Sequence, residues 1–97
     1  MSLETYRKQV SNCQENIAKL QVDKGRFSLK AVAALKKKQD ALAAASRSKS
    51  SSVISTKGRE ALRHESDQSK ALVEMAKIDR KIAEEQKRLV VAQKKVD

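Results

Sequence analysis

The feature that most constrains this chain is an apolar repeat of seven residues in its second half. Positions seven residues apart hold Ala61, Gln68, Met75, Ile82, Leu89 and Val96, and the places three residues further on hold His64, Ala71, Ile78, Glu85 and Ala92. Apolar residues at alternating steps of three and four line the side of a helix that packs against another helix. The repeat therefore predicts a coiled-coil helix over residues 57–96.

The first half of the chain carries the same pattern up to Phe27. Alternating steps of three and four connect Leu3, Tyr6, Val10, Cys13, Ile17, Leu20, Lys24 and Phe27. The pattern then changes frame: Ala31 and Leu35 follow at steps of four, and Lys38, Leu42 and Ala45 continue from Leu35. Such an insertion is a stutter, which locally relaxes a left-handed supercoil. We therefore expect a helix over residues 3–45 whose apolar seam is displaced after Phe27.

A serine-rich segment over residues 46–56 separates the two periodic stretches. Serine competes for backbone hydrogen bonds and favours turns and helix N-caps, which predicts a turn here. The candidate caps of the second helix are Ser52, Ser55 and Thr56, and Glu60 would then lie in its first turn.

Folding the chain within the serine-rich segment would bring apolar side chains together from both stretches. Ile17 would lie near Ile82, and Val10 would lie near Leu89. An antiparallel hairpin is therefore the first expectation. A second arrangement stays open, because neither Pro nor Gly interrupts residues 46–57: one continuous helix, paired in parallel with another chain.

The supply of apolar side chains predicts self-association. Hydrophobic residues make up 39% of the 97, but there is one Phe, one Tyr and no Trp, so large rings are not available to build a deep core. A narrow aliphatic seam buries little surface per residue and leaves a lone chain marginally stable. We expect an all-α fold with a single coiled-coil domain over residues 1–97, an antiparallel helical hairpin that dimerises into a four-helix bundle. The residues expected to form the oligomer seam are Val10, Ile17, Leu20, Phe27, Leu35, Leu42, Met75, Ile78, Ile82 and Leu89.

Most of the net charge of +10 lies in the middle of the chain. Residues 24–63 hold eleven Lys and Arg against two acidic residues, so a hairpin would have one strongly basic end. Such an end attracts polyanions, and nucleic acid binding is the alternative function. Few aromatic side chains are available for base stacking, which limits this to contact without sequence preference. The expected contact residues are Lys36, Lys37, Lys38, Arg47, Lys49, Lys57 and Arg59.

The sequence does not predict an enzyme, a metal site or a cofactor. Cys13 and His64 are the only pairing of a strong nucleophile with a histidine base, and in a hairpin they would lie about 35 Å apart at the helical rise. One Cys and one His do not provide the clustered ligands of a zinc site. Gly25 and Gly58 stand alone, so there is no glycine-rich phosphate loop.

No segment of the sequence predicts a membrane span or a secretory signal. The longest apolar runs, residues 31–35 and 41–45, are far shorter than the roughly 20 residues that cross a bilayer. A single cysteine cannot form an internal disulfide, which suits a reducing compartment. We therefore expect a cytoplasmic protein.

Three segments resemble the N-terminal coiled coils of bacterial defence proteins that carry a Toll/interleukin-receptor (TIR) domain. They are the repeat over residues 76–89 (AKIDRKIAEEQKRL), the opening MSLETY and the run SSSVISTK over residues 50–57. The resemblance implies a non-enzymatic segment for oligomerisation and protein interaction, at the N-terminus of a longer bacterial effector whose C-terminal domain carries the activity. No TIR active-site residue has a counterpart here, so the resemblance implies no activity for this chain.

Overall fold

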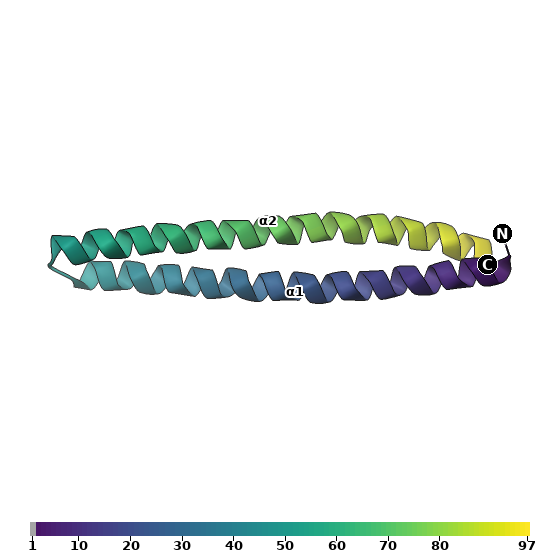
Figure 1. The fold of residues 1–97 in the computed structure, drawn as a ribbon, viewed down its shortest axis with the longest axis horizontal. Coiled ribbons are helices and arrows are strands. Elements are labelled where there is room, and N and C mark those ends of the chain that lie inside the picture. The colour runs from purple at the N-terminus through teal and green to yellow at the C-terminus, as the bar shows by residue number, and fades with distance from the viewer. Residues whose placement is uncertain (1) are drawn as a thin grey trace. The chain divides into compact units, whose positions relative to one another are not determined.

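The computed structural model describes residues 2–97 and consists of two α-helices. Helix α1 spans Leu3–Arg47 and helix α2 spans Ser51–Val96, and the two form an antiparallel hairpin (Figure 1). The part of the chain that is described contains no strand. The all-α hairpin is thus confirmed over the alternative of one continuous helix. Neither helix, over residues 2–97, has a stretch long and apolar enough to cross a membrane.

The turn between the helices is much shorter than the predicted turn over residues 46–56. Helix α1 continues to Arg47, and α2 already begins at Ser51, so the turn between them consists of residues 48–50. Serine is only a moderately weak helix former, and the remaining serines are accommodated within the helices. Near the end of α1, the Ser46 hydroxyl donates a hydrogen bond to the Ala43 carbonyl oxygen at 2.8 Å.

Ser50 is the residue that caps α2. Its Oγ accepts a hydrogen bond from the backbone N–H of Val53 at 3.4 Å, and its own N–H donates to Ser48 Oγ at 3.1 Å. The N-cap prediction was wrong because the chain turns earlier than the pattern indicated, which leaves Ser52, Ser55 and Thr56 inside α2. The first turn of α2 contains no acidic residue, so Glu60 does not interact with the helix dipole there.

Tertiary contacts divide the hairpin into two units, which are described separately. The terminal unit comprises Met1–Gly25 and Met75–Asp97, and the turn unit comprises Arg26–Glu74. Each unit contains one segment of α1 and one segment of α2.

The terminal unit has a seam of mixed side-chain sizes. Cys13, Ile78 and Ala92 are buried. The larger aliphatic side chains of this seam are half-buried: Val10, Ile17, Leu20, Met75, Ile82 and Leu89. An ion pair joins Lys24 Nζ to Asp79 Oδ1 at 2.8 Å across the two helices. The α2 side of this seam follows the predicted heptads.

The turn unit has a seam of alanines. Its buried residues are Ala31, Ala34, Ala41, Ala61 and Ala71. Ala31, Ala34, Lys38 and Ala41 continue the alternation of three and four that begins before Phe27, so the α1 seam runs on without the predicted stutter.

Leu35 and Leu42, which the predicted frame places in the seam of the hairpin, are exposed instead. Their neighbours Ala34 and Ala41 occupy the seam. The distance between packed helices depends on the side chains at the contact, and alanine allows the backbones to approach closely. A seam of leucines would hold the same helices further apart.

Candidate interaction surfaces

Most of the predicted seam residues lie between the two helices of the same chain. Ile78 is buried and seven others are half-buried: Val10, Ile17, Leu20, Phe27, Met75, Ile82 and Leu89. Contacts within one hairpin already account for their burial. A role for these residues in contacts between chains stays a prediction.

One side of the turn unit is marked by an ion pair between the helices. Lys38 Nζ lies 3.7 Å from Glu65 Oε1, and both side chains remain partly exposed. On α1, Leu35 lies three residues before Lys38 and Leu42 lies four residues after it. Residues three or four apart share one face of a helix. Both leucines therefore lie on the side of the turn unit where the ion pair forms.

Two leucines of α2 lie on this same side. Leu62 lies three residues before Glu65, and Leu72 lies seven residues after it, which are spacings that keep a helix face. We call these four side chains the leucine face; their exposed fractions are 36% for Leu35, 47% for Leu42, 65% for Leu62 and 49% for Leu72. Large aliphatic side chains grouped in this way around one ion pair are typical of a surface that binds another protein.

The other flank of the same seam is charged. The positions immediately before seam residues hold Lys30, Lys37, Glu60, Asp67 and Glu74. Some of these charges interact with their neighbours: Lys57 Nζ lies 3.2 Å from Glu60 Oε2, and Lys30 Nζ lies 5.1 Å from the centre of the Phe27 ring. The two flanks of the turn unit therefore differ in chemistry.

The sequence pattern did not identify the leucine face. The predicted frame places Leu35 and Leu42 in the seam, and the predicted heptads of the second stretch include neither Leu62 nor Leu72. A usable signal was present, because Ala34 and Ala41 keep the heptad frame of Phe27 and move the leucines to flanking positions. The leucines are larger than the neighbouring alanines, and for that reason the pattern places them in the seam.

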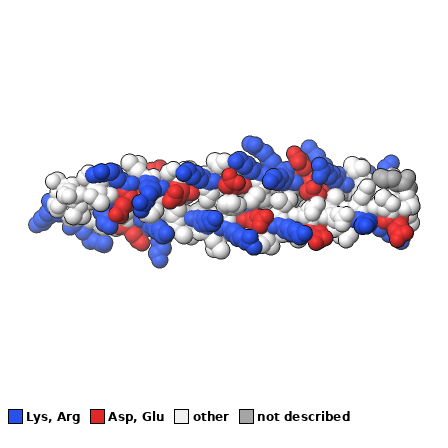
Figure 2. Space-filling view, in the orientation of Figure 1, with Lys and Arg blue, Asp and Glu red and all other residues white. Residues whose placement is uncertain are grey.

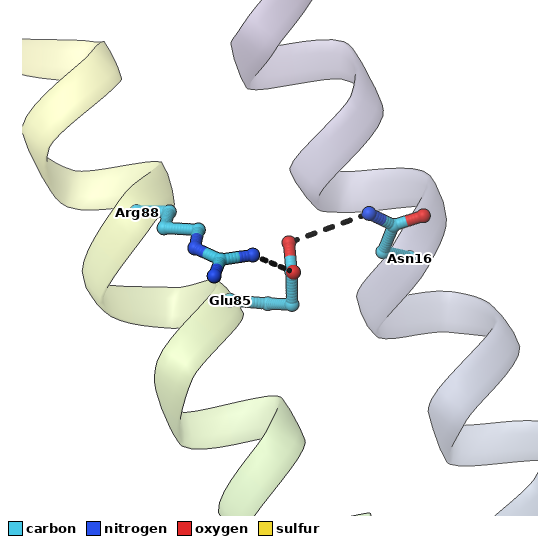
Figure 3. A network of polar contacts seen from close by, with 3 residues as sticks. All are labelled: Asn16, Glu85 and Arg88. Atoms are coloured by element: carbon cyan, nitrogen blue, oxygen red, sulfur yellow. Dashed lines mark hydrogen bonds and ion pairs between the residues drawn. The ribbon is translucent and has the colours of Figure 1, made fainter.

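A groove in the terminal unit contains a partly buried carboxylate (Figure 3). Glu85 occupies a seam position of α2, and its side chain is 13% exposed. Arg88 Nη1 donates to Glu85 Oε1 at 2.8 Å, and Asn16 Nδ2 donates to Glu85 Oε2 at 3.4 Å. A carboxylate removed from water needs such partners. Because Asn16 belongs to α1, the network favours one register between the helices of this unit.

Cys13 lies in the same groove and is not an activated nucleophile. Burial raises the pKa of the Cys13 thiol, and the hydrogen bond to Glu85 and the charge of Glu85 raise it further, against an opposing effect of Arg88. Reactive cysteines have lowered pKa values, because the thiolate is the nucleophile. The surroundings of Cys13 keep it a neutral thiol at neutral pH.

The basic residues near the turn are only partly available to a ligand. Lys36, Lys37, Arg47, Lys49 and Arg59 are exposed, and Figure 2 shows basic side chains around the end of the hairpin that holds the turn. The other two candidates, Lys38 and Lys57, are half-buried and form ion pairs with Glu65 and Glu60. Five of the seven predicted contact residues are therefore exposed, and the other two keep partial exposure beside an acidic neighbour.

Among residues 2–97, no group of three or more His, Cys, Asp or Glu side chains could hold a metal ion. Comparison of the chain with models of protein families, with curated proteins and with solved structures finds no match. The interaction surfaces are thus assigned from the residues of this chain alone.

Proposed function

We propose that this chain is a non-enzymatic coiled-coil module that assembles with copies of itself. The observation that carries the proposal is the size of the side chains that the hairpin buries. Among residues 2–97, six of the eight buried hydrophobic residues are alanines, whereas thirteen large hydrophobic residues are exposed. Burial of an alanine removes much less apolar area from water than burial of a leucine. Association with another chain would supply the burial that the single hairpin lacks.

The accessible surface supports the same proposal. The chain exposes 7186 Å². A compact monomer of 10.8 kDa exposes about 5500 Å² by the usual scaling with mass. The excess of about 1600 Å² is twice the area of about 800 Å² that each partner contributes to a standard interface. One chain can therefore contribute a full interface and still keep an ordinary amount of surface in water.

The resemblance to coiled coils of TIR-type defence proteins supports a more specific version. In that version the module is the N-terminal assembly segment of a longer bacterial effector, and assembly brings copies of a C-terminal effector domain together. A cytoplasmic location belongs to this version, because Cys13 is the single cysteine and cannot form a disulfide bond within the chain.

Thermal unfolding at several protein concentrations tests self-assembly. A folded state held together by association gains stability with concentration, so the melting temperature followed by circular dichroism should rise as the chain is concentrated. A melting temperature that is constant over a hundredfold range of concentration, with full helicity, would count against the proposal.

A second candidate function is polyanion binding at the turn end of the hairpin. The exposed charges of Lys36, Lys37, Arg47, Lys49 and Arg59 favour it. Binding of DNA or RNA by such contacts releases counterions, and affinity then falls steeply with salt.

Titration of a labelled duplex DNA and a labelled single-stranded RNA at low and at moderate salt tests this candidate. We expect a variant with Arg47→Gln, Lys49→Gln and Arg59→Gln to bind more weakly and with a smaller salt dependence. Lys8→Gln, Lys94→Gln and Lys95→Gln together provide a control with the same loss of charge outside the turn unit. Absence of binding to either nucleic acid at low salt would remove the candidate.

A further inference from the structure

We infer that the leucine face is where a second copy of this chain docks, in a two-fold symmetric arrangement that pairs Lys38 of each copy with the partner's Glu65. The inference rests on the proposed function and specifies its interface. It differs from the seam that the sequence predicts, because most residues of that seam are already buried or half-buried within one hairpin.

The apolar part of the inference follows from exposure. Leu35, Leu42, Leu62 and Leu72 leave between 36% and 65% of their surface in water within the single hairpin. They come from both helices and surround one ion pair, so a flat pair of helices could cover all four at once. Two hairpins packed through such faces make a four-helix bundle.

The charges at the centre of the face select a second copy as the occupant. In a two-fold interface, if one residue of the first copy contacts a second residue of the partner, then that second residue of the first copy contacts the first residue of the partner. A patch in such an interface must therefore be complementary to itself. Lys38 and Glu65 meet this condition, because one is basic and the other acidic. Their separation of 3.7 Å and their partial exposure leave both able to pair with a second chain.

The charged flank of the turn unit suits solvent and not this interface. Lys30, Lys37, Glu60, Asp67 and Glu74 would each lose water if a copy covered them. Docking through the leucine face leaves these side chains hydrated. The arrangement therefore places the aliphatic flank inside the assembly and the charged flank outside it.

Charge reversal followed by mixing tests the inference. Lys38→Glu gives a face with two acidic residues, and Glu65→Lys gives a face with two basic residues, so each variant should repel its own copies. By multi-angle light scattering we expect the wild-type chain at twice 10.8 kDa and each single variant at 10.8 kDa. An equimolar mixture of the two variants should return to twice that mass, because an acidic face then meets a basic one.

The outcomes of the mixing experiment separate the two proposals. Single variants that both stay dimeric would overturn the leucine face while leaving self-assembly intact. Monomeric single variants whose mixture stays monomeric would overturn the pairing of Lys38 with the partner's Glu65. A wild-type chain that is monomeric at all concentrations would remove both the interface and the proposed function.

An uncharged substitution covers the case in which a charge reversal unfolds the hairpin. Leu62→Gln changes a side chain that is 65% exposed, so the hairpin should keep its helicity by circular dichroism while its dimer fraction falls. Val22→Gln is the matched control, because Val22 is 58% exposed and belongs to the terminal unit. Equal dimer fractions for the two variants would contradict the inference.

Discussion

The terminal unit and the turn unit each pack a segment of α1 against a segment of α2, but they use different side chains between the helices. In the terminal unit the seam contains Ile17, Leu20, Ile78 and Ile82, which are buried or half-buried there. In the turn unit the buried seam residues are alanines, and the leucine face flanks them. A seam of large residues buries its apolar surface within the chain. A seam of alanines buries less, and the leucines beside it stay exposed to another partner. From this difference we infer that the terminal unit stabilises the hairpin and that the turn unit binds a second copy of the chain.

The largest expected effect is the loss of a large seam residue from the terminal unit. Ile78 is buried, so Ile78→Ala should lower the free energy of unfolding by about 2–5 kcal/mol, through lost apolar burial and the cavity left behind. Chemical denaturation measures this change. Ile54→Ala is the control, because Ile54 is 43% exposed, and it should cost much less. Equal losses of unfolding free energy at the two sites would contradict the difference drawn between the two units.

The turn unit should respond to the opposite change. Ala41 is buried in the alanine seam, so Ala41→Leu should force the helices apart and lower the free energy of unfolding by about 1–3 kcal/mol. Ala33→Leu, at an exposed position of α1, should leave stability nearly unchanged, because Leu and Ala have similar helix propensities. An increase in stability for Ala41→Leu would show that the alanine seam is not closely packed.

A smaller effect is expected at the turn itself. Ser50→Ala removes the hydroxyl that accepts the Val53 N–H and should cost about 1 kcal/mol. Ser52 lies inside α2, where alanine is the better helix former, so Ser52→Ala should be neutral or slightly stabilising. If denaturation ranked the two variants the other way, Ser50 would not be the cap.

The smallest effect is a pH dependence from Cys13 in the terminal unit. Its pKa in the folded chain is raised above the ordinary value of 9.0, so the unfolded chain loses this proton first as the pH rises. The native state then binds more protons than the unfolded state, and stability must fall with rising pH. The contribution is fully present below pH 9.0 and declines above it. Denaturation of the wild-type chain and of Cys13→Ala between pH 8 and pH 10 should show a steeper decline for the wild type; parallel curves would contradict the assignment.

The sequence predicted α2 better than α1, and the reason lies in side-chain size. Met75, Ile82 and Leu89 are both large and correctly spaced, so the heptads of α2 identified its seam and the all-α hairpin. In α1 the buried seam residues after Phe27 are alanines, and the larger Leu35 and Leu42 lie beside them. Hydrophobic periodicity gives most weight to large residues and therefore indicated a stutter that is not there.

The position of the turn could not be predicted for a different reason. Residues 46–56 contain many serines, and a serine hydroxyl can cap a helix or lie within one at little cost. Which serine serves as the cap depends on where the two helices separate. That point is set by packing across the seam, so local sequence alone did not distinguish Ser50 from Ser52 or Ser55.

Sedimentation equilibrium of the wild-type chain tests the central claim most directly. The residues that the hairpin buries are mainly alanines, and we propose that the exposed leucine face meets a second copy, so the measured mass should be a multiple of 10.8 kDa at micromolar concentration. The fully helical chain should then dissociate only on dilution. A mass of 10.8 kDa across the whole accessible range, in a chain that stays helical, would contradict the account.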